Sequence, residues 1–218
     1  MSDGSDRAPR AEAPRPNVAN RPPPSAPGSG HGPGVLVLAA GARHGDLARE
    51  ACARLARHGF VAWAPELPTA TGGPPIDSER AAVDAAARQL FCEHATDGPR
   101  LGLVGFGRGG LLGLDAAARG ARVAAVIGLD ACFSAMSESP SRLDAFVLAV
   151  FAEKDPAVSS GQVAALERSL RDESVGCELR VQPGVDEGFL DPARADRYDA
   201  AAARATWDKA LARLRAEL

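Results

Sequence analysis

The chain has 218 residues, with 25 basic and 28 acidic side chains and a formal net charge of −3. A chain of this length is expected to form one domain with a core of ordinary size. Its weakly acidic balance provides no electrostatic attraction to nucleic acid or to an anionic membrane surface, and neither is expected as a partner.

The sequence also predicts where the protein resides. No stretch approaches the roughly 18 consecutive apolar residues of a membrane span. The N-terminal region lacks the apolar run of about 7–15 residues that is typical of a secretory signal. The four cysteines stand far apart, without a C-x-x-C pair, at Cys52, Cys92, Cys132 and Cys177. We therefore expect a cytoplasmic protein whose thiols are reduced and mostly packed in the core.

Residues 1–33 differ in composition from the rest of the chain. They contain eight of the 17 prolines, separated by Ser, Gly and Arg, and almost no large apolar side chain. Such a segment buries too little surface to offset its ordering entropy, so we expect a disordered tail. The proline run at 22–24 leaves a second interpretation open, a polyproline II segment that docks on a partner. The folded domain is predicted over residues 34–218.

Buried strands and helices are predicted to alternate along this domain. Continuous apolar runs predict strands at 35–39, 60–64, from 101 onward, 123–128, 145–151 and 177–181. Helical patterns predict helices at 46–58, 78–93, through 115–118, 161–172 and 198–218. The last helix carries an apolar stripe of Trp207, Leu211, Leu214 and Leu218.

This alternation is typical of an α/β protein with a parallel sheet covered by helices on both faces. In such folds the functional site lies at the carboxyl ends of the strands. The loops expected there are 40–45, 106–109, 153–158 and 183–191.

The segment 101–112, LGLVGFGRGGLL, combines an apolar strand, a glycine-rich turn and the start of a helix. A strand that bends sharply into a helix raises one residue to the rim of the sheet, beside the helix amino end. In hydrolases with the α/β fold this raised residue is the nucleophile. Here it is Gly107, which has no side chain. The segment therefore predicts a protein that keeps the backbone arrangement of an acyl-transfer site but lacks the attacking side chain.

Several segments, taken in order, resemble the dienelactone hydrolase family over residues 34–218. They are VLVL, LAREACARLARHGFVAWAPEL, GFGRGG, VLAVFAEKDPAVSS, PGVDEGF and DPARADRYDAAAARATWDKAL. The resemblance implies a single-domain α/β-hydrolase fold with a mostly parallel sheet. It also implies a lineage that hydrolyses lactones and carboxylic esters and that needs no cofactor.

That family uses a Cys-His-Asp triad, in which a thiolate attacks the carbonyl and the histidine transfers protons. By the resemblance, Asp155 matches the aspartate, Gly107 takes the place of the cysteine, and Glu187 takes the place of the histidine. A glutamate that helps to activate the cysteine is matched by Ala40. Three of the four catalytic positions are thus substituted.

Other features of the turn are expected to persist. A nucleophile at this bend carries backbone strain of about 1–3 kcal/mol, which glycine at 107 would relieve. The resemblance also implies that the backbone amides of Arg108 and Gly41 still converge to bind an oxyanion or a ligand at a helix amino end. The Arg108 side chain has two interpretations, contact with an anionic ligand or a surface position.

Asp155 and Glu187 also leave two interpretations open. If they lie close together, one carboxyl pKa would rise and a glutamate base could activate water directly. Alternatively, Glu187 is solvated in a polar loop and has no catalytic role. The four histidines are spread too widely to indicate a metal site.

Three functions remain as hypotheses. In the first, a degenerate homologue binds a small carbonyl or carboxylate compound without covalent turnover. In the second, Glu187 and Asp155 activate water in a working lactone or ester hydrolase. In the third, the Pro-rich tail recruits a partner to an interaction module. The sequence does not indicate an oligomeric state.

Overall fold

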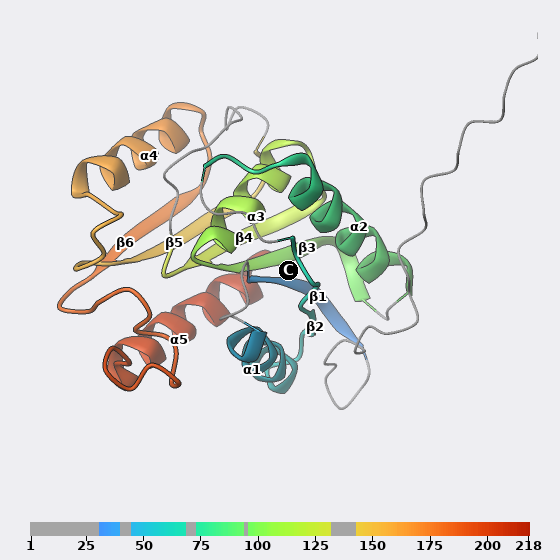
Figure 1. Ribbon diagram of the computed structural model, residues 1–218. Helices are drawn as coiled ribbons and strands as arrows, with labels where there is room; N and C mark the ends of the chain where they lie inside the picture. The colour runs from blue at the N-terminus through green and yellow to red at the C-terminus, as the bar shows by residue number, and fades with distance from the viewer. Residues whose placement is uncertain (1–30, 40–44, 69–72, 94–95, 132–142) are drawn as a thin grey trace, which may run out of the picture.

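The computed structural model describes residues 31–39, 45–68, 73–93, 96–131 and 143–218 (Figure 1). The strands are β1 (Gly32–Ala39), β2 (Val61–Trp63), β3 (Thr96–Phe106), β4 (Val123–Leu129), β5 (Phe146–Ala152) and β6 (Cys177–Gln182). The helices are α1 (Gly45–Arg57), α2 (Asp77–Glu93), α3 (Arg108–Ala118), α4 (Ser160–Asp172) and α5 (Ala200–Glu217). Each predicted strand and helix is present, with shifts at its ends.

Two strands begin earlier than the apolar runs predicted. Thr96 and Asp97 at the start of β3 pair with Gly32 and Pro33 of β1, although neither segment is apolar. The strands are therefore longer than their buried parts, because backbone pairing continues beyond the core. β1 also begins before residue 34, the expected start of the domain. Residues 1–30, which hold most of the expected tail, lie outside the described residues.

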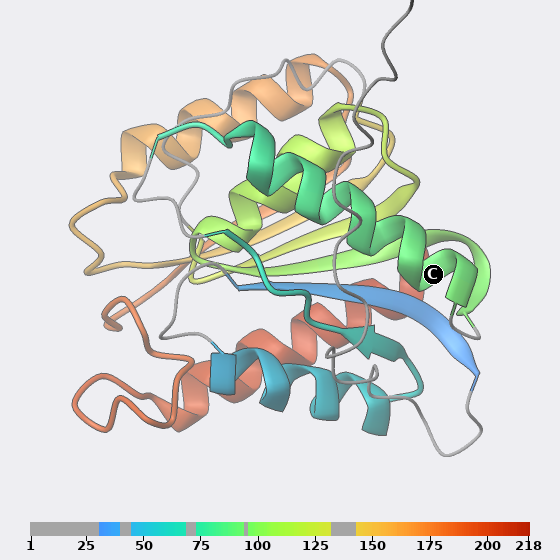
Figure 2. The same cartoon turned by 45° about the vertical axis from the view of Figure 1, so that its right-hand side comes forward.

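The six strands form one parallel sheet in the order β2-β1-β3-β4-β5-β6. Helices α2, α3 and α4 cover one face, and α1 and α5 cover the other (Figures 1 and 2). The fold is thus α/β with helices on both faces of a parallel sheet, as predicted. None of the helices in the described part of the chain is long and apolar enough to span a membrane.

The alternation of side chains along the strands builds two cores. On β1, Val35 and Val37 face the α1/α5 side, whereas Leu36 and Leu38 face the α2/α3 side. The predicted stripe of α5 is confirmed, because Trp207, Leu211 and Leu214 are buried and Leu218 packs against the same core. Because both faces of the central strands are buried, their carboxyl ends are held in fixed positions.

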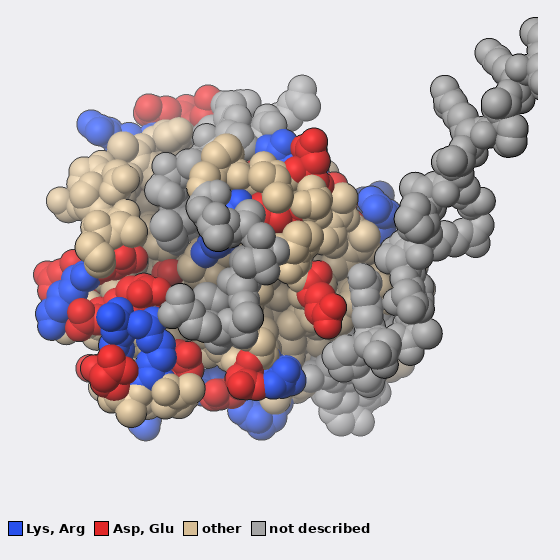
Figure 3. Space-filling view, viewed as in Figure 1, with Lys and Arg blue, Asp and Glu red and all other residues tan. Residues whose placement is uncertain are grey.

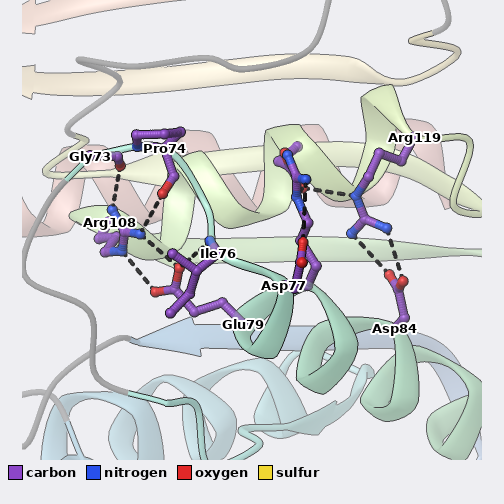
Figure 4. Close-up of polar contacts among 10 residues, drawn as sticks. Gly73, Pro74, Ile76, Asp77, Glu79, Asp84, Arg108 and Arg119 are labelled. Carbon is purple, nitrogen blue, oxygen red and sulfur yellow. Dashed lines mark hydrogen bonds and ion pairs between the residues drawn. The ribbon is translucent and has the colours of Figure 1, made fainter.

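A chain of ion pairs joins α2 to α3 on the face of the sheet that these two helices cover (Figure 4). The buried Asp115 of α3 accepts hydrogen bonds from Arg80 at 2.8 Å and from Arg119 at 2.9 Å. Arg119 in turn donates to both carboxylate oxygens of Asp84, at 2.9 and 3.0 Å. The pairing is charge-assisted and bidentate, which fixes the orientation of the two helices.

Candidate active site

Gly107 lies at the bend between β3 and α3. Its backbone has φ 52° and ψ −116°, and its N–H donates to the carbonyl oxygen of Leu129 at 3.1 Å. A residue with a Cβ adopts such a positive φ only at a cost, so glycine suits this position. The predicted strand-turn-helix bend is present, with residue 107 at its crest.

The other glycines of the bend allow close packing of α3 on the sheet. A Cβ at Gly109 would stand 1.8 Å from the carbonyl oxygen of Leu38, and a Cβ at Gly105 would stand 2.2 Å from the Gly109 backbone. A Cβ at Gly107 meets no such obstacle. Among the described residues beyond its chain neighbours, only the carbonyl oxygen of Asp130 comes within 4 Å of it, at 3.9 Å. Within the described part of the chain, the crest of the bend therefore has room for a small group.

Asp155 lies in the turn after β5. It is buried, and its carboxylate accepts a hydrogen bond from the N–H of Ala157 at 2.8 Å. This bond holds the carboxylate within its own turn.

Glu187 lies in the loop between β6 and α5, and half of its side chain (51%) is exposed. Its carboxylate pairs with Arg197 at 3.3 Å and with Arg194 at 3.6 Å. Acidic and basic side chains alternate on the molecular surface around this loop (Figures 1 and 3). In the described residues Glu187 thus pairs with arginines, and no hydrogen bond joins it to Asp155.

Asp130 is a further carboxylate at this edge, which the sequence analysis did not single out. It follows β4 directly, beside the strand that leads to Gly107. Its backbone has φ 51°, and its Oδ2 accepts a hydrogen bond from the N–H of Gly188 at 2.5 Å. Its Oδ1 is buried, and none of the described residues donates a hydrogen bond to it. A buried carboxylate oxygen without a donor is costly and is therefore a candidate contact for a ligand or water.

The surroundings of Asp130 change its acidity. Burial, and to a lesser degree the nearby carboxylates of Glu187 and Asp155, raise the pKa of Asp130 from 3.8 to about 6. The Gly188 N–H and the Arg194 guanidinium oppose this rise. The acidity of Asp130 thus depends on charges of the turn after β5 and of the β6–α5 loop, which follow strands that end at the same edge of the sheet.

The raised pKa predicts that Asp130→Asn stabilises the protein at neutral pH. Below about pH 4 the carboxyl is protonated in both the folded and the unfolded chain, so its ionisation costs the fold nothing. As the pH rises through about 6, the folded state must hold a buried charge, at a cost of order 1–3 kcal/mol. Asparagine carries no charge and tolerates positive φ. Urea unfolding at pH 4 and pH 8 measures this difference.

Asp144→Asn, which removes an exposed carboxylate before β5, is the matched control for that measurement. We expect it to change the free energy of unfolding by less than about 0.5 kcal/mol. Equal stability of Asp130→Asn and the native chain at pH 8 would contradict the buried charge.

The Arg108 side chain is held by the protein. It donates from Nε and Nη2 to both oxygens of Glu79, at 2.8 and 2.7 Å, and to the carbonyl oxygens of Gly73 and Pro74 (Figure 4). Glu79 is fully buried and also accepts from the N–H of Ile76. The guanidinium thus ties the segment before α2 to the first residue of α3. The predicted role of Arg108 in binding concerns its backbone amide, which belongs to the first helical turn.

Several sequence candidates lie outside the described residues. They include Gly41, the second expected amide donor, together with Ala40 and Cys132. In the described part of the chain Cys52, Cys92 and Cys177 are free thiols, and burial raises the pKa of the Cys52 thiol to about 12. No group of three or more His, Cys, Asp or Glu residues that could hold a metal ion is found within the described residues.

A parallel sheet with a glycine-rich bend at the end of a central strand defines the α/β-hydrolase class. The profile of the dienelactone hydrolase family matches residues 23–218. The chain belongs to the dienelactone hydrolase family.

Solved structures share the fold of this chain. A dienelactone hydrolase-like promiscuous phosphotriesterase from metagenomic libraries has a TM-score of 0.74 and 23% identity, over 88% of each chain. A putative dienelactone hydrolase from Klebsiella pneumoniae has a TM-score of 0.70 and 25% identity, over 84% of this chain and 86% of that one. A thermophilic esterase from Thermogutta terrifontis has a TM-score of 0.65 and 15% identity, over 86% and 84%. A comparison with curated protein sequences finds no match.

Proposed function

We propose that this protein has lost the covalent mechanism of its family and binds a small carbonyl compound, such as a lactone, an ester or a carboxylate, at the bend. The observation that carries the proposal is Gly107, which occupies the crest with no side chain and a positive φ. Without a thiol or hydroxyl at this point, no acyl-enzyme forms there. The room above Gly107 and the amino end of α3 remain available to a carbonyl group.

The state of Glu187 supports the loss of the covalent route. A histidine at this position would shuttle a proton between nucleophile and leaving group. Glu187 is instead half exposed and paired with Arg194 and Arg197. Asp155, which would orient a histidine, instead accepts a hydrogen bond from a backbone N–H of its own turn. The residual pair is therefore poorly placed to activate water.

The absence of an acyl-enzyme is tested with p-nitrophenyl acetate. We expect the native protein to give no burst of p-nitrophenolate and no acetyl adduct on a pocket residue, measured by intact mass and peptide mapping. The double variant Gly107→Cys with Glu187→His is expected to give a burst approaching one equivalent per chain, because thiol and base are then both present.

Gly107→Ala with Glu187→His is the matched control, since it adds a Cβ in the same strained backbone but no thiol. An acetyl group on any side chain of the native protein at the carboxyl edge of the sheet would contradict the proposal. Retained binding of dihydrocoumarin by the native protein, followed by saturation-transfer NMR, would support the ligand site.

A further inference from the structure

We propose that Asp130 is the general base of a direct hydrolysis in this pocket, accepting a proton from a water above Gly107 that attacks an ester or lactone carbonyl. The inference rests on the proposed ligand site and goes beyond binding. It assigns the proton transfer to a residue outside the triad positions Asp155 and Glu187.

The first observation is the position of Asp130. Phe106 at the end of β3 pairs with Leu129 at the end of β4. Gly107 and Asp130 are the residues that directly follow this pair, so they lie next to each other at the ends of neighbouring strands. The hydrogen bond from the Gly107 N–H to Leu129 fixes this register. The Asp130 backbone is the nearest described group to the space that a side chain at 107 would fill, at 3.9 Å. The proposed water occupies this space, next to the backbone of the residue that carries the carboxylate.

The second observation is the hydrogen bonding of the carboxylate. Oδ2 is engaged by the Gly188 N–H, whereas Oδ1 is buried and receives no hydrogen bond from the described residues. One oxygen is thus anchored and the other is available as an acceptor. A general base needs this arrangement, since it must be oriented and still within reach of the proton that it removes.

The third observation is the backbone conformation. Asp130 and Ser174 are the non-glycine residues with positive φ in the described part of the chain, and only Asp130 lies at the carboxyl edge of the sheet. Such conformations are found preferentially at functional sites. A strained backbone that holds a partly unsatisfied carboxylate is unfavourable for folding, which indicates a role in ligand chemistry.

The charges around Asp130 suit this role. Glu187 from the β6–α5 loop and Asp155 from the turn after β5 raise its proton affinity, in addition to burial. Arg194 from the β6–α5 loop and the Gly188 N–H limit the rise. With a pKa of about 6, the carboxyl is largely ionised at neutral pH and is a stronger base than an ordinary aspartate.

The proposed step is balanced without a co-reactant. The water oxygen forms a bond to the carbonyl carbon while Asp130 accepts one water proton, and the carbonyl electron pair moves onto the oxygen. When the carbonyl re-forms, the bond to the leaving oxygen breaks and Asp130 returns the proton to it. The products are a carboxylic acid and an alcohol, and no bond to the protein forms at any stage.

The test measures steady-state hydrolysis of p-nitrophenyl acetate by the full chain. We expect slow turnover without a burst, falling as the pH drops through about 6 because Asp130 becomes protonated. Asp130→Asn is expected to lower the rate about 100-fold. Asp144→Asn, the same substitution at the exposed amino end of β5, is expected to keep the native rate.

Asp130→Gly distinguishes catalysis from folding. Glycine accepts the positive φ without strain and leaves space for a small carboxylate. Added formate is expected to restore part of the rate in this variant in proportion to its concentration, which a purely structural role would not produce.

Two results would overturn the inference: native dihydrocoumarin binding without turnover, or an Asp130→Asn rate equal to that of the native chain. The proposed function fails by a different result, an acyl adduct on the native protein.

Discussion

Replacing Gly109 with alanine is expected to prevent stable folding. The new Cβ would stand 1.8 Å from the Leu38 carbonyl oxygen and 2.6 Å from its carbon, so the obstacle is the backbone of β1. A flexible side chain could move aside, but β1 is paired on both sides and cannot. We expect a loss of about 3 kcal/mol or more in the free energy of unfolding, the upper part of the range for overpacking. Urea unfolding followed by circular dichroism measures it.

Gly113→Ala, one turn further along α3, is the control. Its Cβ would meet only side chains of Val126 and Leu103, at 3.3–3.6 Å, and alanine favours the helix by about 1 kcal/mol. We expect a change within about 1 kcal/mol of the native value. An unfolding midpoint of Gly109→Ala equal to that of Gly113→Ala would mean that α3 lies farther from β1 than described.

The second large effect is expected from Arg108→Met. The guanidinium binds both carboxylate oxygens of Glu79, a side chain with 0% exposure. Removing it leaves the buried Glu79 charge without its cationic partner, which costs about 3–5 kcal/mol. Replacing both residues together, with Met at 108 and at 79, is expected to recover most of the loss. Unfolding in urea at pH 7 compares the three proteins.

The exposed pair Arg171–Glu167 provides the control for this experiment. Arg171→Met removes a hydrogen bond of similar length, 2.6 Å, and we expect no measurable change in the free energy of unfolding, because this pair is exposed to solvent. A comparable effect of the two substitutions would contradict the buried character of the Arg108 pair.

The Glu79 pair also predicts a dependence on pH. Burial alone would raise the pKa of Glu79, but hydrogen bonds from Arg108 and Ile76 outweigh it and hold the pKa below 4.5. Because the folded pKa is the lower one, the pair contributes its full stability above pH 4.5 and loses it as the pH falls further. The penalty of Arg108→Met should therefore shrink in acid.

The succession of strands and helices could be predicted from the sequence. The runs at 35–39 and 123–128 are continuous and apolar, since both faces of these strands are buried. The bend at Gly107 could be predicted because only a few turns require so many glycines after an apolar strand. The first residues of β1 and β3 could not be predicted as strand, because these residues pair beyond the core and show no pattern of apolar side chains.

The candidate site was harder to predict. Asp130 follows an apolar strand directly, VAAVIGLD, and a charged residue at that point is a signal that could have been used. The hydrogen bond to its Oδ2 comes from Gly188, 58 residues away, and cannot be deduced from the sequence. The Arg108–Glu79 pair likewise joins residues 29 apart, and residue types alone do not determine such partners.

The ion pairs between α2 and α3 have a consequence for motion. Arg108 fixes the first turn of α3 to Glu79, while Asp115 and Arg119 fix its later turns to Arg80 and Asp84. The first half of α2 is thus tied to α3 along its length, and the two open and close as one cooperative unit. We expect amide protons in the first half of α2 to exchange with solvent no faster than those of α3, because the two segments must separate together.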